Sequence, residues 1–326
     1  MRALVHENGG LHMKEMELQK PGGSEVVVKL KAAGLNRRDL AIPGRRKESE
    51  EALILGSDGA GIIEEIGKNV IDVNVGDEVI INPSLRWVQN SEAPPKEFDI
   101  LGMPDHGTFA EKIVISEDQV EPKPAYMSWE EAAAFPLAAL TGYRAMFTKG
   151  DLQKTDTVFI PGAGGGVATY LIAFAKNIGA RVITTSRSEE KREKARKLGA
   201  DVVIDTADDW DEKLSNETVD MVIDSNGKAT FHRSLSILKK GGKFVTFGAT
   251  TEDTVAFDLR AFFYGQYKLI GSTMGCREEL IAALEHAEEY QLQPVVDRIF
   301  SLDQSLDALS YLEEGKQFGK VIIRIA

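Results

Sequence analysis

A glycine-rich turn between a strand and a helix constrains the fold of this chain more than any other feature. The turn spans residues 161–168 (PGAGGGVA) and follows the β-branched run 158–160 (VFI). A helical segment, 167–178, begins inside the turn and ends at Gly179. Strand, glycine turn and helix in this order are typical of a βαβ unit whose turn binds a phosphate group.

The alternation of strand and helix continues beyond this turn. Gly179 and Gly199 each end a predicted helix and are followed by an alanine and a strand, as glycines at helix C-termini often are. The pattern favours a parallel, doubly wound α/β sheet, and six strands match a dinucleotide-binding domain. The predicted strands are 158–160, 182–185, 202–204, 221–224, 244–247 and 269–271.

We expect the glycine turn to hold the pyrophosphate of a dinucleotide. Gly162 and Gly164 fit the first two positions of the G-x-G-x-x-G pattern, whereas Val167 stands at the third. Glycines let backbone N–H groups approach a pyrophosphate, and the helix N-terminus adds free donors and partial positive charge. A glycine turn that only packs is the alternative. The predicted cofactor contacts are Gly162, Ala163, Gly164, Gly165, Gly166 and Val167.

The residues after the second predicted strand favour NADPH over NADH. NAD-specific sites place an acidic residue about 20 residues after the turn, where it bonds the ribose 2′-hydroxyl. Here the strand ends in Ser186-Arg187-Ser188 without a carboxylate. Ser186 can donate a hydrogen bond, and Arg187 and Lys191 can pair with a 2′-phosphate. The alternative is that Ser188 only caps the next helix and that both cations are solvated.

Outside this unit, the first 120 residues contain short strands separated by glycine, proline and asparagine, which favours a compact β-rich domain. We expect a domain over 1–121, a dinucleotide-binding domain over 122–265, and a last strand with a return to the first domain over 266–326. The predicted strands of the first part are 25–30, 61–67, 77–81 and 109–115. The later segments are a long loop at 83–107, helices at 278–290 and 305–315, and a strand at 321–325.

Composition limits the partners that this chain can have. Its 326 residues include 39 Lys and Arg against 51 Asp and Glu, a formal net charge of -12. Such a charge repels phosphate backbones and anionic lipid surfaces, so neither nucleic acid nor a membrane is an expected partner. The single cysteine, Cys276, fits a reducing compartment, and we expect a cytoplasmic protein.

Five further segments resemble the medium-chain dehydrogenase/reductase superfamily, which contains the zinc-dependent alcohol dehydrogenases. The resemblance covers essentially the whole chain and is closest to the zinc-lacking, quinone-oxidoreductase-like branch. It implies a GroES-like β domain, a Rossmann domain with a six-stranded sheet, and a nicotinamide bound in the cleft between them. The segments are 33–40 (AGLNRRDL), 55–61 (LGSDGAG), 75–79 (VGDEV), 107–111 (GTFAE) and 140–143 (LTGY).

Departures from the zinc enzymes of this superfamily indicate the branch. Those enzymes carry a ligand cysteine where this chain has Asn36, and a His-Glu pair where it has Ser57-Asp58. Their structural zinc uses four cysteines in the lobe that corresponds to 82–107, where this chain has none. Asparagine and serine are poor zinc ligands, so we expect no zinc.

The resemblance also implies roles for individual residues. It places Asn36 near the nicotinamide and the substrate carbonyl, and lets Asp39 organise the site through hydrogen bonds. The alternative for Asn36 is that it caps a turn. The alternative for Asp39 is that it caps the short helix that follows. No proton donor stands out among the side chains. The cofactor contacts that the resemblance adds are Thr141, Phe247, Gly248, Ala249, Met274, Gly275 and Lys320, the last of which approaches the cofactor phosphates in the family.

The activity implied is hydride transfer from NADPH to a quinone or an α,β-unsaturated carbonyl, because these acceptors need no Lewis acid to take a hydride. Two alternatives remain: an enoyl-thioester reductase of the same superfamily, and a non-catalytic NADPH-binding sensor or structural protein. By analogy with the family, the strand at 269–273 (LIGST) is expected to pair across a homodimer.

Overall fold

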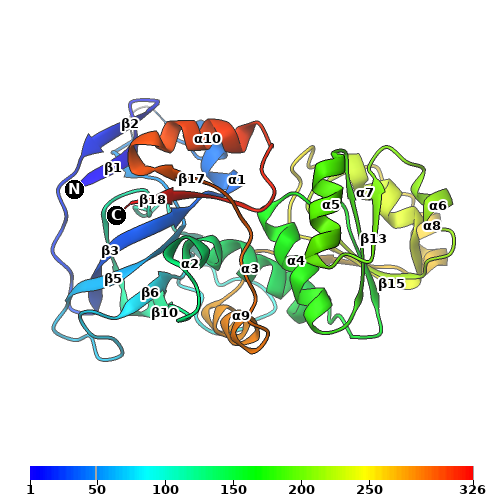
Figure 1. Cartoon of the computed structure of the whole chain (residues 1–326), viewed down its shortest axis with the longest axis horizontal. Helices are drawn as coiled ribbons and strands as arrows, with labels where there is room; N and C mark the ends of the chain where they lie inside the picture. Colours follow the sequence, from blue (N-terminus) through cyan, green and yellow to red (C-terminus); the bar gives the residue numbers. More distant parts are fainter. Residues whose placement is uncertain (48–49, 326) are drawn as a thin grey trace. The chain divides into compact units, whose positions relative to one another are not determined.

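The computed structural model describes residues 1–47 and 50–325, and the chain divides into two units (Figure 1). Unit 1 consists of residues 1–140 and 275–326, and unit 2 of residues 141–274. The expected boundary after residue 121 is therefore too early. Helix α2 (Trp129–Ala134) packs on strands β3 (Glu25–Gly34) and β5 (Asp58–Ile66), which places it in unit 1.

Unit 1 is built on a seven-stranded sheet in which segments from both ends of the chain are neighbours. Its strand order is β10-β6-β5-β3-β18-β17, and β9 pairs with β3 off this path. The C-terminal strand β18 lies antiparallel to β3, so the last strand of the chain belongs to the same sheet as the amino-terminal ones. Besides β3 and β5, the strands are β6 (Glu78–Ile81), β9 (Lys112–Ser116), β10 (Val120–Pro122), β17 (Val296–Ser301) and β18 (Lys320–Arg324).

Two small sheets and several helices complete unit 1. The small sheets have the orders β2-β1-β4 and β7-β8. Their strands are β1 (Arg2–Glu7), β2 (Gly10–Glu15), β4 (Leu53–Ile54), β7 (Ser84–Leu85) and β8 (Asp99–Ile100). The helices are α1 (Arg37–Ala41), α9 (Arg277–Glu289) and α10 (Ser305–Glu313), with short 3-10 turns at Pro43–Arg45, Glu117–Gln119 and Leu302–Gln304.

Alternating apolar side chains of the seven-stranded sheet form the core of unit 1. One buried cluster joins the sheet to α10, and a second lies between β3, β5, β6 and β9. The segment predicted as a loop at 83–107 is tied to α9, because Arg277 N donates to Trp87 O (2.9 Å) and Glu278 N to Val88 O (3.2 Å). The main members of the first cluster are Leu4, Leu35, Ile42, Leu55, Phe109, Leu309, Leu312, Val321 and Ile323.

Unit 2 is a parallel six-stranded sheet of order β13-β12-β11-β14-β15-β16, which confirms the predicted doubly wound Rossmann-type fold. All six strands were predicted at their places in the sequence. Phe159, Ile183, Trp210, Val222 and Phe244 are among its buried core residues. The strands are β11 (Thr157–Ile160), β12 (Arg181–Ser186), β13 (Val202–Asp205), β14 (Val219–Asp224), β15 (Leu238–Thr246) and β16 (Lys268–Gly271).

Helices pack on this sheet along its length. Helices α4 and α5 contact β11, β12 and β13, whereas α7 and α8 contact β14 and β15. A further helix, α3 (Pro136–Tyr143), starts in unit 1 and continues into a π-helical turn at Arg144–Lys149. The helices of unit 2 are α4 (Gly166–Asn177), α5 (Glu189–Leu198), α6 (Trp210–Lys213), α7 (Lys228–Ser236) and α8 (Leu259–Gly265).

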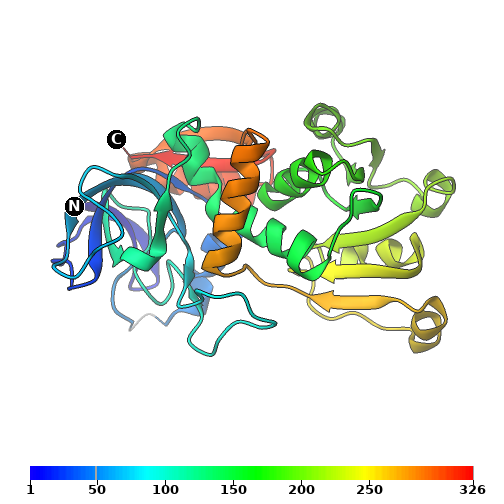
Figure 2. The same ribbon diagram turned by 90° about the horizontal axis from the view of Figure 1, so that it is seen from below.

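Strand β16 is the outer strand of the unit 2 sheet, and it lies beside β15 alone (Figure 2). Leu269 on this strand is 46% exposed, and Phe263 and Tyr264 on the neighbouring helix α8 are more exposed still. An outer strand has unpaired backbone groups that a second chain can use. Pairing of two copies through β16 stays a prediction.

The close pairing of β3 with β5 yields a test of the unit 1 fold. A Cβ atom on Gly61 would lie against the Lys29 carbonyl oxygen and 2.9 Å from Leu30 Cα, so backbone would have to move. We expect Gly61→Ala to lower the free energy of unfolding by about 1–3 kcal/mol, as overpacking does. Gly44→Ala, where nothing lies within 4 Å, is the matched control and should change it by less than about 0.5 kcal/mol. Urea denaturation followed by circular dichroism measures both, and equal stability of the two variants would contradict the packing described.

Candidate active site

The glycine turn of unit 2 is held in shape by the strand beside it. Gly162 has φ +90°, a conformation that side chains other than glycine rarely adopt. Its N–H donates to Thr185 Oγ1 (3.2 Å), and the Ala163 N–H donates to Thr185 O (2.8 Å). Ala163 is fully buried, and its contact with the cofactor stays a prediction. It supports the turn and leaves the neighbouring glycines as the exposed surface.

The N-terminus of α4 is open, as a pyrophosphate site requires. Gly165 is the N-cap residue, and among the described residues no side chain caps the helix there. The first N–H groups of a helix have no partner within it, and they point outward with partial positive charge. Gly164, Gly166 and Val167 are half-buried, and Gly165 is exposed. These four residues therefore fit the phosphate-binding role predicted for them.

Asn226 and Asp224, which sequence reasoning missed, support the glycine turn from the end of β14. Asn226 Nδ2 donates to Pro161 O (2.9 Å), and the Asn226 N–H donates to Asp224 Oδ1 (2.6 Å). Thr230 Oγ1 donates to Asp224 Oδ2 (2.6 Å), and burial raises the pKa of this carboxyl above its usual value. The only sign of these residues in the sequence was the polar run Asp-Ser-Asn, which begins with the last residue of β14.

The end of β12 carries the side chains predicted to select the cofactor. Ser186 is buried, and its Oγ accepts from the Ser188 N–H at 3.3 Å. Arg187 is exposed and has no hydrogen bond or ion pair within residues 1–47 and 50–325. Lys191 lies on the first turn of α5 and is half-buried. The guanidinium of Arg192 is occupied, because it donates to Ser186 O (2.7 Å) and to Asp205 Oδ2 (2.5 Å).

The remaining predicted cofactor contacts differ in their burial, and one of them lies in unit 1. Gly248 and Ala249 are exposed after β15, and Phe247 is half-buried, with its N–H donating to Asp224 O (3.3 Å). Thr141 and Met274 are buried. Gly275 belongs to unit 1, where it has φ +142° and its carbonyl accepts from Ser84 Oγ at 2.5 Å. Contact of these residues with a cofactor stays a prediction.

Unit 1 contains a buried polar cluster that the sequence did not reveal as one site. Lys320 begins β18, Asn36 is the second residue after β3, and Asp58 begins β5. Because β18, β3 and β5 are neighbours, these three positions meet at the same end of the sheet. We call Asn36, Asp39, Asp58 and Lys320 the Lys320 cluster.

The Lys320 ammonium is the centre of this cluster. Its Nζ donates to Leu35 O (2.8 Å), Asn36 Oδ1 (2.7 Å) and Asp58 Oδ2 (2.8 Å), which uses all three of its hydrogens. The lysine is 3% exposed. Every donor of Lys320 thus has a partner within unit 1, and its approach to the cofactor phosphates stays a prediction.

Asn36 and Asp58 complete the hydrogen-bond network around that ammonium. Asn36 Nδ2 donates to Asp58 Oδ2 (2.8 Å), and the Leu137 N–H donates to Asp58 Oδ1 (2.7 Å). Asp58 is fully buried, and Lys320 is its ion-pair partner. The side chain of Asn36 thus bonds both members of this ion pair, although Asn36 is also the N-cap residue of α1.

Asp39 lies next to this network and is fully buried. Its Oδ2 accepts from the Asn36 N–H (2.7 Å), whereas its Oδ1 has no hydrogen-bond partner among the described residues. Burial raises the pKa of Asp39 to about 6, although the Asn36 N–H and the charges of Arg38 and Lys320 act in the opposite direction. Asp39 thus both closes the first turn of α1 and keeps one oxygen unused.

A second basic residue is fixed beside the cluster. Arg38 Nη1 donates to Ser57 Oγ and to Leu101 O, both at 2.6 Å, and Ser57 Oγ donates to Leu101 O at 2.8 Å. Burial lowers the pKa of Arg38. Ser57, which stands beside Asp58 in the sequence, is therefore engaged with Arg38 and the backbone.

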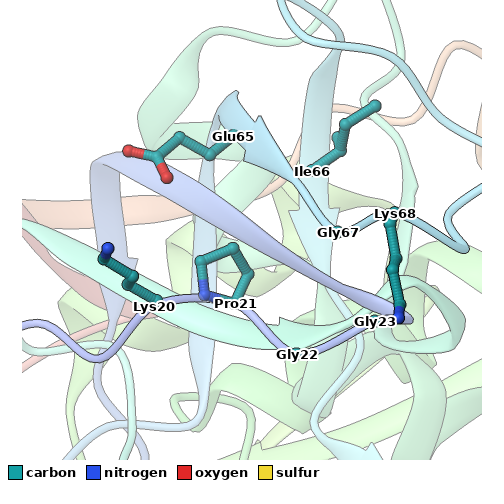
Figure 3. A pocket seen from close by; sticks show the side chains of 8 residues that line it. All are labelled: Lys20, Pro21, Gly22, Gly23, Glu65, Ile66, Gly67 and Lys68. Carbon is teal, nitrogen blue, oxygen red and sulfur yellow. The ribbon is translucent and has the colours of Figure 1, made fainter.

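An open surface hollow of about 470 Å³ in unit 1 lies apart from these residues (Figure 3). Its glycines allow backbone segments to approach closely, since a Cβ on Gly67 would meet the carbonyls of Gly22 and Gly23. None of the predicted site residues lines it. The lining residues are Lys20, Pro21, Gly22, Gly23, Glu65, Ile66, Gly67 and Lys68.

Comparisons with known proteins agree with both halves of this architecture. The alcohol dehydrogenase GroES-like domain family matches residues 22–125, and the zinc-binding dehydrogenase family matches residues 166–289. The zinc-type alcohol dehydrogenase-like protein YogA of Leptosphaeria maculans is 30% identical over 97% of this chain and 94% of that protein. The chain belongs to the alcohol dehydrogenase superfamily. It is an oxidoreductase of the medium-chain dehydrogenase/reductase type.

Two further relatives carry different activities in their names. The acryloyl-coenzyme A reductase of Sulfurisphaera tokodaii is 28% identical over 97% of this chain and 96% of that protein. The crystal structure of an NAD-dependent alcohol dehydrogenase has a TM-score of 0.94 at 34% identity and covers 100% of both chains. Members of this superfamily close to the chain therefore include proteins named for alcohols and for an unsaturated thioester.

The residues present do not fit the catalytic zinc of the alcohol dehydrogenases. The resemblance places Asn36 and Ser57 at ligand positions of the zinc enzymes, and the ammonium of Lys320 is bonded to both Asn36 and Asp58. A cation in contact with these side chains opposes a second one. No group of three or more His, Cys, Asp or Glu side chains within residues 1–47 and 50–325 is placed to hold a metal ion. In the same part of the chain, no helix is long and apolar enough to cross a membrane.

The buried carboxyl of Asp39 makes a prediction about pH and stability. Because its pKa is raised to about 6 in the folded protein, the unfolded chain releases this proton at a lower pH than the folded one. The contribution of Asp39 to stability is therefore present at low pH and is lost as the pH rises through about 6. Between pH 5 and pH 7, the free energy of unfolding of Asp39→Asn should rise by about 1 kcal/mol relative to that of the wild type.

Urea denaturation of both proteins at several pH values measures this difference. Asp307→Asn is the matched control, because Asp307 is an exposed carboxylate of the same unit and its loss should leave the pH profile of stability unchanged. A constant offset between wild type and Asp39→Asn across this pH range would show that Asp39 does not hold a proton in the folded state.

Proposed function

We propose that this oxidoreductase transfers a hydride from NADPH to a quinone or an α,β-unsaturated carbonyl without the help of zinc. The observation that carries the proposal is the Lys320 cluster, in which an ammonium and an amide stand among residues that correspond to zinc ligands in the alcohol dehydrogenases. A simple ketone or alcohol needs strong polarisation of its oxygen, which zinc supplies as a Lewis acid. A conjugated acceptor spreads the charge of the added hydride and needs less.

Asn36 is the group that we assign to the acceptor oxygen. When bound, NADPH supplies the hydride that adds to the conjugated carbon of the acceptor. Negative charge then develops on the carbonyl or quinone oxygen, where a hydrogen bond from Asn36 Nδ2 stabilises it. A proton from water completes the reduction, so that the acceptor gains two electrons and two hydrogens. Positioning and this one donor are the contributions of unit 1 to the chemistry.

The preference for the phosphorylated dinucleotide rests on the end of β12. The exposed guanidinium of Arg187 has no partner among the described residues, and the only carboxylates within four positions after Ser186 are Glu189 and Glu190 of α5. Glu189 is occupied by Arg192, whose Nε donates a hydrogen bond to Glu189 Oε2 (2.9 Å). A cation without a partner at this place suits a 2′-phosphate better than a ribose hydroxyl.

An enoyl-thioester reductase is the second candidate, and the named activity of the acryloyl-coenzyme A reductase favours it. The reaction is the same in its essentials, since an enoyl thioester is a conjugated carbonyl that accepts a hydride at its β-carbon. Asn36 would then face the thioester oxygen. The two candidates differ in the length of acceptor that must be bound. A non-catalytic NADPH-binding protein is the remaining alternative, and binding without turnover on any acceptor would favour it.

The cofactor assignment predicts a specific kinetic change. We expect Arg187→Gln to raise the KM for NADPH about tenfold or more, because a charged hydrogen bond is worth about 1.5–3 kcal/mol, and to leave the KM for NADH within twofold. Oxidation of each nucleotide is followed at 340 nm with a quinone, an enone and an enoyl-coenzyme A in turn. Lys197→Gln, which removes an exposed cation from the same helix region, is the control. Equal KM changes for both nucleotides would contradict the proposal that Arg187 binds the 2′-phosphate.

The role of Asn36 predicts a second change, in the acceptor half of the reaction. Asn36→Ala removes the amide that donates to the substrate and adds no charge beside Asp58, so kcat should fall about 100-fold, as when one oxyanion donor is removed. The dissociation constant of NADPH, measured by fluorescence titration, should stay within about twofold because no cofactor contact is lost. Turnover that is undiminished in Asn36→Ala would exclude the amide as the donor to the acceptor oxygen.

A further inference from the structure

We propose that Lys320 is a positioning residue that fixes the amide of Asn36 with its N–H group toward the acceptor and strengthens that N–H as a donor. The inference rests on the proposed function, because it concerns the donor that we assign to the acceptor oxygen. It assigns Lys320 a role in place of the phosphate contact that the resemblance implied.

The orientation of the Asn36 amide follows from the charge beside it. The oxygen and nitrogen of an asparagine side chain have nearly the same shape, so the hydrogen-bond network alone decides which way the amide faces. Lys320 Nζ lies 2.7 Å from Asn36 Oδ1 and is a donor only. A flipped amide would place its own NH₂ group against this ammonium. It would also turn its oxygen toward Asp58 Oδ2, which now accepts from Nδ2 at 2.8 Å. Both contacts would be repulsive after a flip.

Asn36 is the most exposed member of the Lys320 cluster. Asp39 and Asp58 are 0% exposed and Lys320 is 3% exposed, whereas Asn36 reaches 8%. Nδ2 of Asn36 has two hydrogens, of which one bonds Asp58 Oδ2. The second hydrogen has no partner within residues 1–47 and 50–325. Asn36 is therefore the member of the cluster through which the buried charge can act on a molecule outside it.

The same contact makes the amide a better donor. In a chain of hydrogen bonds, each bond polarises the next, and a buried setting with low dielectric increases the effect. The bond from the ammonium draws electrons toward Oδ1 and so increases the positive charge on the Nδ2 hydrogens. Because negative charge grows on the acceptor oxygen only during hydride transfer, this polarisation acts on the transition state more than on substrate binding.

The closing experiment removes the charge without leaving Asp58 as an unpaired buried anion. Lys320→Met/Asp58→Asn deletes both charges of the pair and keeps an oxygen at position 58 that can accept from Asn36 Nδ2. This double variant is compared with Lys320→Met alone, which breaks the pair and is the version at risk of unfolding. Lys316→Met is the matched control, because Lys316 is exposed on the same unit, and we expect its kcat within twofold of the wild type.

The first measurement needs no turnover. In protein labelled with ¹⁵N at asparagine, the side-chain signals of Asn36 are assigned through their loss in Asn36→Ala. We expect exchange of the Nδ2 hydrogens with solvent to become at least tenfold faster in Lys320→Met/Asp58→Asn and to stay unchanged in Lys316→Met. Unchanged exchange in the double variant would overturn the inference.

The second measurement is a kinetic cycle in which the charge pair is removed with Asn36 present or already replaced by alanine. If Lys320 acts through Asn36, its loss lowers kcat at least tenfold in the first background and less than twofold in the second, while the KM for NADPH stays constant. Equal losses in both backgrounds would show a merely structural role and overturn the inference. Should the wild type reduce none of the three acceptor classes, the proposed function fails, and the exchange measurement still decides the position of the amide.

Discussion

The buried ion pair between Lys320 and Asp58 is the interaction on which unit 1 and its chemistry depend. It joins the last strand of the chain to a strand that lies 262 residues earlier. Removing two charges from water costs several kcal/mol per ion, and this cost is offset only where further hydrogen bonds satisfy each group. Here both partners meet that condition, since the ammonium has three acceptors and each oxygen of Asp58 has a donor. The pair can form only when β18 lies beside β3, so it specifies the position of the C-terminal strand.

The same ion pair restricts the reaction that the site can support. A lysine ammonium with three bonded hydrogens is a fixed positive charge, but it has no open coordination position for a substrate oxygen as a catalytic zinc has. Its influence reaches a substrate only through Asn36, as one polarised hydrogen bond. Such a donor stabilises far less charge than a metal ion. An acceptor that spreads its own charge, as conjugated carbonyls and quinones do, is the class that we propose for such a site. This proposal follows from how completely the lysine is bonded.

The fold was predictable wherever the pattern that encodes it is local. Each strand of the unit 2 sheet and the helices α4, α5, α9 and α10 follow from short apolar runs and from glycines such as Gly179 and Gly199. The amino-terminal hairpin of β1 and β2 was missed, because its second strand is polar and carries no clear alternation. The first domain boundary was placed too early, because α2 looks like the start of the next domain in sequence although its alanines pack on β3 and β5.

Lys320 and Arg187 show why the site was harder to predict than the fold. Both are basic residues near the end of a predicted strand, and sequence alone offered each the same two roles, phosphate contact or solvated surface. What separates them is burial and partners: Arg187 is exposed and unbonded within the described residues, whereas Lys320 is enclosed by three acceptors from the ends of two strands. Those acceptors come from positions 35, 36 and 58, and only the register of β18 on β3 and of β3 on β5 brings them together. A resemblance that transfers roles residue by residue does not predict contacts that depend on strand register. The role of a basic residue in this fold therefore has to be inferred from the hydrogen-bond partners of its nitrogen atoms.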